Sequence, residues 1–400
     1  MGDLVRSLLS SALSVCCCVG GRESAVIAIG THQYRVKRQL GEGGFSLVLL
    51  VEDLNTGAEY AAKKIICQHG TDSFAKAQHE IGAYRAFRHR GIISLADAAV
   101  LEDIPAQPLR SAAASAFAIS SSTRRPVVTG AKTVYMLFPV YKRGNLLDLV
   151  MHNQETERTL DEAFVIGVFS AVCDAVRYLH TFNGRLPDCG RSRNYSAPQA
   201  AGSEALAAAA SGARGGYVQL QGADDSTQPS LPPPEALMAS ATPYAHRDIK
   251  LANVMLADDG HTPVLMDFGS VAPARYTAHT RSEALRIQDD AAENCTMSYR
   301  APELFEVQTG AEFDERTDVW SLGCFLFALA YGYTPFEDPA AGQGASIVLA
   351  AINRKYSVPA SNSFSPRLKQ LVDFMLEPDP KRRPFIDQVI AFTDNLYPAT

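Results

Sequence analysis

The chain has 400 residues, of which 46% are apolar and 20% charged, and its formal net charge is −6 at pH 7. This length and apolar content suffice for two or three domains with large cores, and the small acidic charge gives no reason to expect nucleic acid binding. The eight cysteines form one run, Cys16 to Cys18, and five scattered singles. They lack the paired spacing of a zinc site and indicate buried or free thiols in a reducing compartment. No apolar run reaches the roughly 18 residues that a membrane span needs.

Residues 1–24 combine the cysteine run with leucines near helical spacing, which are Leu4, Leu8, Leu9 and Leu13. A secretory signal, a transit peptide, an uncleaved disordered tail and an acylated membrane anchor are the alternatives. Gly2 would be open to myristoylation after removal of Met1, although Arg6 stands where the motif asks for Ser or Thr. We expect the membrane anchor, with palmitoyl groups on Cys16, Cys17 and Cys18.

Short β-rich runs follow from Gln33, namely YRVKRQL, FSLVLLVEDL and EYAAKKII, with a turn at residues 55–57 between the last two. The sequence GEGGFS at residues 41–46 separates the first two runs. In dinucleotide-binding folds such glycines open a helix, whereas here strands are predicted on both sides, which excludes a dinucleotide-dependent enzyme. Backbone N–H groups of a glycine-rich turn can bind phosphate, and Ser46 is small enough to preserve that approach.

Two helices and two insertions are predicted next. Residues 72–88 form a helical pattern with Asp72 as its cap, and Glu80 lies beside its apolar face. A strand resumes near residue 133, and a second helix begins after Asp161 as its cap. Residues 104–130 are expected to be a loop insertion. Residues 184–242 are rich in Ala, Gly, Ser and Pro, cannot bury enough apolar surface, and are expected to be disordered.

The stretch YAHRDIKLANVMLADDGHTPVLMDFG, residues 244–269, carries the strongest chemical signal. It places Asp248, Asn253 and Asp267 around a short apolar hairpin. Carboxylate and amide oxygens are the hard ligands that Mg²⁺ prefers. Further on, Asp318 stands at the head of an apolar helix that ends near Tyr331, where a carboxylate is costly unless it is hydrogen-bonded.

These motifs together resemble a eukaryotic-type protein kinase over residues 30–397. The strings LGEGGFSLV, FPVYKRGNLLDL, PVLMDFGS, CTMSYRAPELFEVQTG and FDERTDVWSLGC are similar to the numb-associated kinase family, and to an acylated member of it. The resemblance implies an α+β bilobal fold. A small β-rich N-lobe with one main helix would span residues 30–140, and a larger, mostly helical C-lobe would span residues 141–397.

The resemblance also implies the roles of individual residues in a reaction that uses ATP and Mg²⁺. Asp248 would accept the proton of the attacking hydroxyl, and Lys250 would neutralise the transferring phosphoryl group. Asn253 and Asp267 would bind Mg²⁺. Glu80 would hold Lys63 on the ATP phosphates, while Tyr141 would supply the amide that reads the adenine edge. The implied nucleotide-binding residues are Gly41, Glu42, Gly43, Gly44, Phe45, Ser46, Val48, Ala61, Lys63, Pro139, Tyr141 and Met255.

The same pattern assigns partners to several remaining polar residues. Thr296 would tie residues 270–300 to Asp248 and Lys250, Asp318 would bind the backbone of the catalytic loop, and Arg383 would pair with Glu303. Arg247 is placed to bind a phosphorylated activation segment. The candidate phosphorylation sites in that segment are Thr277, Thr280 and Ser282.

Lysine two residues after Asp248 favours Ser/Thr over Tyr in protein substrates. The resemblance further implies autophosphorylation and an acylated N-terminus that holds the enzyme at the Golgi or other internal membranes. The rival hypothesis is a catalytically silent kinase-like scaffold at a membrane. It predicts the loss of Lys63, Asp248 or Asp267, and all three are present.

Overall fold

The computed structural model describes residues 25–43, 46–68, 72–102, 132–186, 243–337, 346–359 and 363–397. The chain divides into two compact units: Met1–Arg88 with Ile93–Lys142, and His89–Ile92 with Arg143–Thr400. Residues 1–24, for which we expect an anchor, residues 104–130 and residues 187–242 lie outside the described residues. Residues 184–186, which we expected to belong to the disordered insertion, are described, and Leu186 is buried, so that expectation was wrong at its first three positions.

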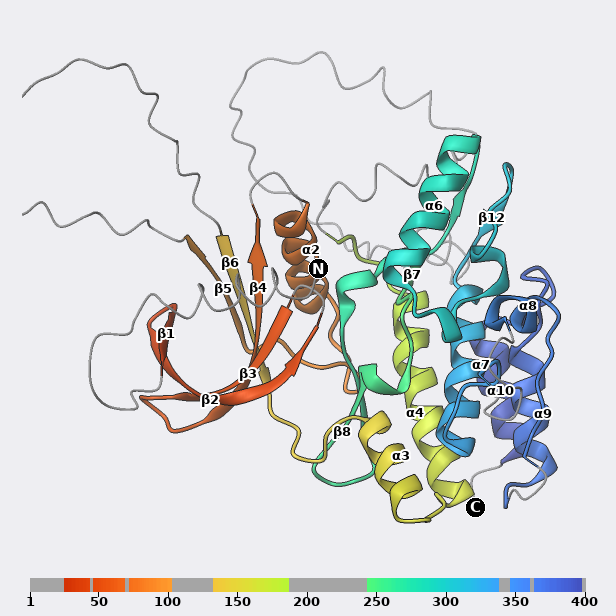
Figure 1. Ribbon diagram of the computed structural model, residues 1–400, viewed down its shortest axis with the longest axis horizontal. Helices are drawn as coiled ribbons and strands as arrows, with labels where there is room; N and C mark the ends of the chain where they lie inside the picture. Colours follow the sequence, from red (N-terminus) through yellow and green to blue (C-terminus); the bar gives the residue numbers. More distant parts are fainter. Residues whose placement is uncertain are drawn as a thin grey trace, which may run out of the picture. The chain divides into compact units, whose positions relative to one another are not determined.

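The first unit is built on a six-stranded sheet with the order β1-β2-β3-β4-β6-β5 (Figure 1). Each neighbouring pair is antiparallel. β1 pairs with β2 and precedes Gln33, where we expected the first strand. The strands are β1 (Val26–Ile29), β2 (His32–Glu42), β3 (Ser46–Asp53), β4 (Glu59–Cys67), β5 (Asp97–Glu102) and β6 (Lys132–Pro139).

Apolar side chains of successive strands form the core of this sheet, because alternate residues of a strand share one face. They are Ile29, Tyr34, Val51, Ala62, Tyr135 and Leu137. Helix α2 (Ser73–Ala86) contacts β4 and β6. Asp72 occupies its N-cap position, but its side chain makes no cap hydrogen bond to a described residue. Asp72 thus takes the expected N-cap position, but its ψ of 2° departs from the extended conformation that a capping side chain needs.

The second unit is mostly helical, and α7 is its most buried helix. Twelve of the 16 residues of α7 are buried, and α7 contacts α4, α9 and α3. The expected cap of α4, Asp161, stands at the N-cap without a side-chain bond to a described residue. The helices are α3 (Leu146–Glu155), α4 (Glu162–His180), α6 (Arg281–Asn294), α7 (Arg316–Tyr331), α8 (Ile347–Ile352), α9 (Pro366–Met375) and α10 (Ile386–Leu396).

Among the described residues, α4 is the one helix long and apolar enough to cross a membrane by length and composition alone. Ten of its residues are buried, and it contacts α7 and α10. That environment is typical of a core helix.

Three short antiparallel strand pairs in the second unit hold the loops on which the functional prediction depends. β7 (Tyr244–Ala245) pairs with β10 (Ala272–Pro273), and β8 (Val254–Leu256) pairs with β9 (Pro263–Leu265). β11 (Tyr276–Thr277) pairs with β12 (Glu312–Phe313). Helix α6 lies inside residues 270–300, the activation segment that the resemblance implies, for which no helix had been named. A β-rich N-terminal unit followed by a helical one is the expected α+β class.

Candidate catalytic site

In the first unit, Lys63 of β4 and Glu80 of α2 form an ion pair. Lys63 Nζ lies 2.7 Å from Glu80 Oε1. Glu80 is only 4% exposed, so its carboxylate needs a compensating charge. The strand register sets the position of Lys63 in the sheet, because Lys63 lies opposite Val48 of β3 on one side and Met136 of β6 on the other. The pair therefore ties α2 to the sheet and orients the Lys63 ammonium.

The glycine-rich turn joins β2 to β3, as the strand–turn–strand prediction requires. Gly41 lies opposite Val48 in the strand register. The N–H of Gly43 donates to the Ser46 carbonyl at 2.8 Å, and a Cβ on Gly43 would lie 3.0 Å from Ser46 Oγ. A side chain at position 43 would therefore crowd the turn. Glu42 ends β2, whereas Gly44 and Phe45 lie outside the described residues.

The other predicted nucleotide-binding residues lie in both units. Ala61 of β4 is opposite Phe138 of β6, and Pro139 at the end of β6 is opposite Tyr60. Tyr141 follows β6 in the first unit, whereas Met255 belongs to β8 in the second.

In the second unit, the carboxylate of Asp248 receives hydrogen bonds from three side chains. Thr296 Oγ1 and the Thr296 N–H donate to Asp248 Oδ1 at 2.6 and 3.1 Å. Lys250 Nζ lies 2.7 Å from Asp248 Oδ2, and Asn253 Nδ2 donates to the same oxygen at 3.0 Å. Lys250 also donates to Thr296 Oγ1 at 2.8 Å. The predicted tie of Thr296 to Asp248 and Lys250 is confirmed, and these donors keep the carboxylate in one orientation.

The backbone before Asp248 is held by Asp318, as predicted. Asp318 Oδ2 accepts from the N–H of His246 at 2.7 Å, and Oδ1 accepts from the N–H of Arg247 at 2.8 Å. Arg247 has a φ of 72°, which strains a residue with a Cβ and needs support from its surroundings. His180 Nε2 lies 3.0 Å from Asp318 Oδ2. Burial alone would raise the pKa of Asp318, but these hydrogen bonds and the nearby histidines hold it below its ordinary value.

Asn253 and Asp267 offer the oxygen ligands expected for a magnesium ion. Asn253 Nδ2 donates to the Asp248 carbonyl at 2.8 Å as well as to its carboxylate, so the amide presents Oδ1 elsewhere. The N–H of Met266 donates to the Asn253 carbonyl at 2.9 Å, which joins the two loops next to Asp267. Asp267 has a left-handed φ of 66°, and the following Phe268 is fully buried against His246. A carboxylate and an amide oxygen on adjoining loops fit the chemistry of Mg²⁺.

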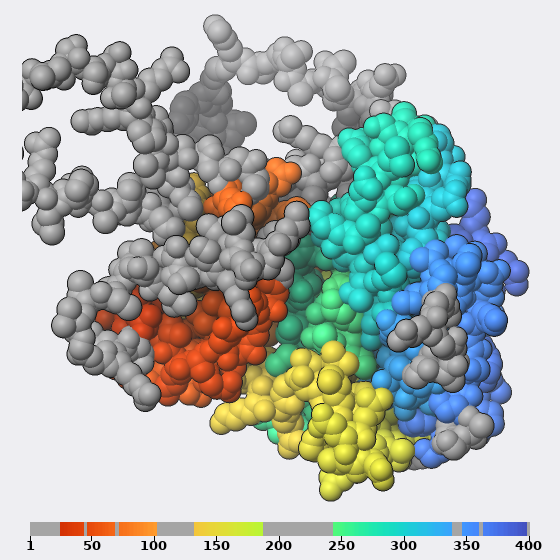
Figure 2. Space-filling view, in the orientation of Figure 1, coloured from red at the N-terminus to blue at the C-terminus, as the bar shows by residue number. Residues whose placement is uncertain are grey.

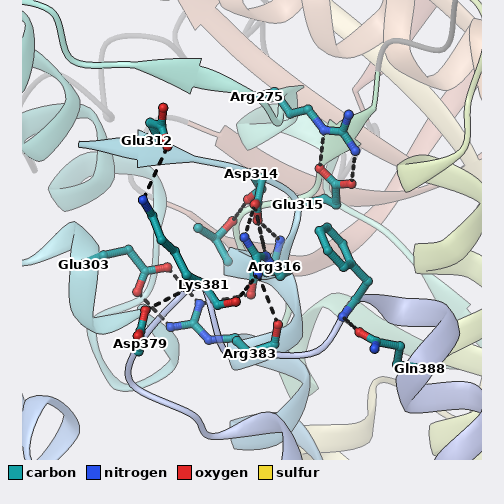
Figure 3. A network of polar contacts seen from close by, with 12 residues as sticks. Arg275, Glu303, Glu312, Asp314, Glu315, Arg316, Asp379, Lys381, Arg383 and Gln388 are labelled. Carbon is teal, nitrogen blue, oxygen red and sulfur yellow. Dashed lines mark hydrogen bonds and ion pairs between the residues drawn. The ribbon is translucent and has the colours of Figure 1, made fainter. Parts of the chain in front are cut away.

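The segment after Asp267 is anchored by arginine–carboxylate pairs (Figure 3). Arg275 makes a bidentate contact with Glu315 at 3.0 and 2.7 Å. Arg383, whose side chain is fully buried, makes another with Glu303 at 2.8 and 2.9 Å, which confirms that predicted pair. Tyr276 stacks on Phe313 with ring centroids 4.8 Å apart. These contacts fix both ends of the segment to the helical unit.

Helix α6 and one of its contacts were not predicted from the sequence. Arg247 Nη2 forms an ion pair with Asp290 Oδ2 on α6. The sequence does hold a signal for this helix. Thr280 and Glu283 form a capping box, and Ala284, Ile287 and Ala291 recur at helical spacing as its buried face.

Comparison with known proteins gives a family match over both units. The protein kinase domain matches residues 34–184 and 241–392. Serine/threonine-protein kinase 16 of Mus musculus is 33% identical over 386 residues, covering 96% of each chain. Serine/threonine-protein kinase ppk13 of Schizosaccharomyces pombe is 29% identical over 378 residues, covering 93% of each. Serine/threonine-protein kinase ENV7 of Saccharomyces cerevisiae is 27% identical over 403 residues, covering 98% of this chain and all of the relative.

Proposed function

We propose a function from one premise: the chain belongs to the protein kinase family, whose domain matches residues in both of its compact units. The enzyme transfers the γ-phosphate of Mg-ATP to serine and threonine hydroxyls of protein substrates, and to hydroxyls of its own chain. The names of its relatives support the Ser/Thr class. The observation that carries the proposal is the Asp248 carboxylate, held by Thr296, Lys250 and Asn253.

The residues of the candidate site have different roles in phosphoryl transfer. Asp248 orients the acceptor hydroxyl and takes its proton, while Lys250 places positive charge beside the transferring group. Asn253 and Asp267 would hold magnesium, which would neutralise charge on the phosphates. In the first unit, Glu80 keeps the Lys63 ammonium in place for the ATP phosphates. The residues proposed for the nucleotide are, in the first unit, those of the glycine-rich turn with Ala61, Pro139 and Tyr141, and in the second unit Met255.

The test is phosphoryl transfer from radiolabelled ATP to a generic acceptor and a peptide library. Asp267→Ala removes a magnesium ligand and should abolish transfer without unfolding the protein. Asp248→Asn should lower kcat by several orders of magnitude, because positioning and charge supply most of the rate enhancement. Asp289→Ala, at an exposed aspartate of α6, is the matched control and should transfer normally.

Near wild-type transfer by purified Asp267→Ala protein would contradict the assignment. A folded wild-type protein that transfers nothing to any acceptor would favour the silent scaffold instead.

We also propose the finer assignment to the numb-associated kinase family, which the similar strings named in the sequence support.

We further propose that the enzyme is attached to internal membranes through residues 1–24. The support for this attachment is the run of Cys16, Cys17 and Cys18 beside an apolar helical pattern. One myristoyl chain binds a membrane only marginally, so stable attachment needs a second signal, which thioesters on these cysteines would provide. Because Arg6 weakens the glycine motif, the cysteines should matter more than Gly2.

Fractionation with acyl-label detection tests the anchor. Changing Cys16, Cys17 and Cys18 to Ser should move the protein to the soluble fraction, whereas Gly2→Ala should have a weaker effect and Cys189→Ser none. Activity on a soluble peptide should be unchanged. An unlabelled protein that is soluble with or without the three cysteines would refute the anchor, and a mature N-terminus beyond Cys18 would indicate a transit peptide.

A further inference from the structure

Arg247 is a buried cation next to the proposed catalytic base. Its side chain is 4% exposed, and its backbone N–H is bound by Asp318. A guanidinium at such a position is costly to desolvate unless an anion pairs with it. The identity of that anion therefore bears directly on the position of Asp248.

In this structure a carboxylate of the same chain pairs with the guanidinium. Asp290 Oδ2 contacts Arg247 Nη2, and Asn294 Nδ2 donates to Asp290 Oδ1 at 2.8 Å. The Asn294 carbonyl in turn accepts from Ser270 Oγ at 3.1 Å. The last turn of α6 thus contacts the residue before Asp248 and a residue three positions after Asp267.

The same turn leads directly to the tether on Asp248. Helix α6 ends at Asn294, and Thr296, which donates to Asp248 Oδ1, follows two residues later. Asp290 therefore fixes the helix end from which Thr296 reaches the catalytic carboxylate.

The candidate phosphorylation sites lie at the opposite end of α6. Thr280 is its N-cap, Ser282 is in its first turn, and Thr277 precedes both. Asp290 lies ten positions after Thr280, which is about 15 Å along a helix. A phosphate on Thr280 or Ser282 could replace Asp290 on Arg247 only if the helix unwound.

Several contacts oppose such unwinding. Thr280 and Glu283 form the capping box, Arg281 Nη1 donates to the Val307 carbonyl at 3.3 Å, and the Val307 N–H donates to Gln288 Oε1 at 3.2 Å. The opposite face of α6 is exposed at Arg281, Ser282, Leu285, Arg286 and Asp289, and the helix lies at the surface of the second unit (Figure 2).

We propose that Asp290 is a positioning residue that acts through Arg247, and that its carboxylate takes the place of an activation-segment phosphate. Phosphoryl transfer by this kinase then needs no phosphate on residues 270–300. The inference rests on the proposed function and adds to it how the site is kept in its working arrangement.

The test compares phosphatase-treated protein, shown by intact mass to carry no phosphate, with untreated protein. Treatment should leave the initial kcat of the wild type unchanged. Asp290→Asn keeps the size of the side chain and removes its charge, and should lower kcat by about tenfold to a hundredfold through misplacement of Asp248, with KM for ATP nearly unchanged. Asp290→Glu should restore part of the loss, and formate should partly rescue Asp290→Ala. The matched control is Asp289→Asn, the exposed neighbour on the same helix, which should behave as wild type.

A wild type that loses its activity on phosphatase treatment, or an Asp290→Asn variant with unchanged kcat, would overturn the proposal. If Asp290→Asn fails to fold, the proposal is still tested by Asp290→Glu and by the comparison of phosphatase-treated with untreated wild type. Hydrogen exchange of residues 281–296 gives a readout independent of catalysis: it should accelerate in Asp290→Asn and not in Asp289→Asn. Were the wild type inactive, the proposed function would fail while this exchange result still tested the contact.

Discussion

Asp318 shows why a charged residue stands at the head of α7, a helix of which twelve of 16 residues are buried. It is completely buried, yet its two oxygens accept from the N–H groups of His246 and Arg247 and contact His180. An unsatisfied carboxylate at this place would be strongly destabilising, whereas one bound by several donors stabilises the strained loop before Asp248. The core of the second unit and the catalytic loop therefore share this single side chain.

The lowered pKa of Asp318 leads to a prediction about acid stability. A carboxyl whose pKa is lower in the folded than in the unfolded state contributes stability that is complete above its unfolded pKa, about 3.8 here, and is lost as pH falls through the folded value. Asp318→Asn should lower the free energy of unfolding at pH 7 by roughly 2 to 3 kcal/mol. The difference in free energy of unfolding between the wild type and Asp318→Asn should stay constant from pH 7 to pH 5. It should narrow below about pH 4.

Urea unfolding at a series of pH values measures this gap. Asp387→Asn, at an exposed aspartate in the first turn of α10, is the control and should show no comparable gap at neutral pH. A gap that stays constant down to pH 3 would show that the charge of Asp318 contributes nothing to acid stability.

At the scale of elements, the sequence predicted best those features that local pattern determines. The strands around the glycine-rich turn follow from β-rich runs with turn residues between them, and α7 follows from a long apolar stretch. The Arg383–Glu303 pair joins residues 80 positions apart, and only the family pattern could bring it to notice. The contacts among Asp248, Lys250 and Thr296 were likewise predicted only from the family pattern.

The misses have physical causes as well. β1 is only four residues long, and its pairing with β2 adds it to the sheet. Helix α6 has a polar sequence with few apolar residues, and its capping box at Thr280 was the available signal. The contact between Arg247 and Asp290 spans 43 positions and depends on where α6 ends, so no local rule gives it. Asp72 and Asp161 are of a residue type that often caps helices. Whether such a side chain accepts a hydrogen bond from the first helical turn depends on the backbone conformation and on the side-chain orientation, which the sequence does not give.

At the scale of the whole molecule, each compact unit carries its own part of the proposed machinery. The first holds the glycine-rich turn and the Lys63–Glu80 pair, and the second holds Asp248 with its donors and the predicted magnesium ligands. Each unit also stabilises its own part through buried contacts.

The second unit is also where the sequence predicts the longer insertion, and the residues that flank it are tightly packed. The N–H of Leu186 donates to the Tyr244 hydroxyl at 3.0 Å, and both residues are buried. The Pro243 carbonyl accepts from the N–H of Ala274 at 2.8 Å, and Tyr244 contacts the ring of Phe182. The chain therefore leaves and re-enters the fold at neighbouring points, and a short connection can join them.

We predict that a linker of about eight glycine and serine residues can replace residues 187–242 without loss of catalysis. The reason is that the entropy cost of closing a loop changes only slowly with its length. The free energy of unfolding should change by about a kcal/mol, and kcat and KM for ATP should match those of the full chain. A variant in which the same residues are scrambled at constant length controls for their sequence. The same linker combined with Tyr244→Phe, which removes the hydroxyl that joins the two ends, should be less stable than the linker alone. If the linker variant unfolds or stops transferring phosphate while the scrambled variant does not, the length of the segment is required. If both fail, its particular sequence contributes to the folded enzyme, and the expectation of a dispensable, disordered insertion is wrong.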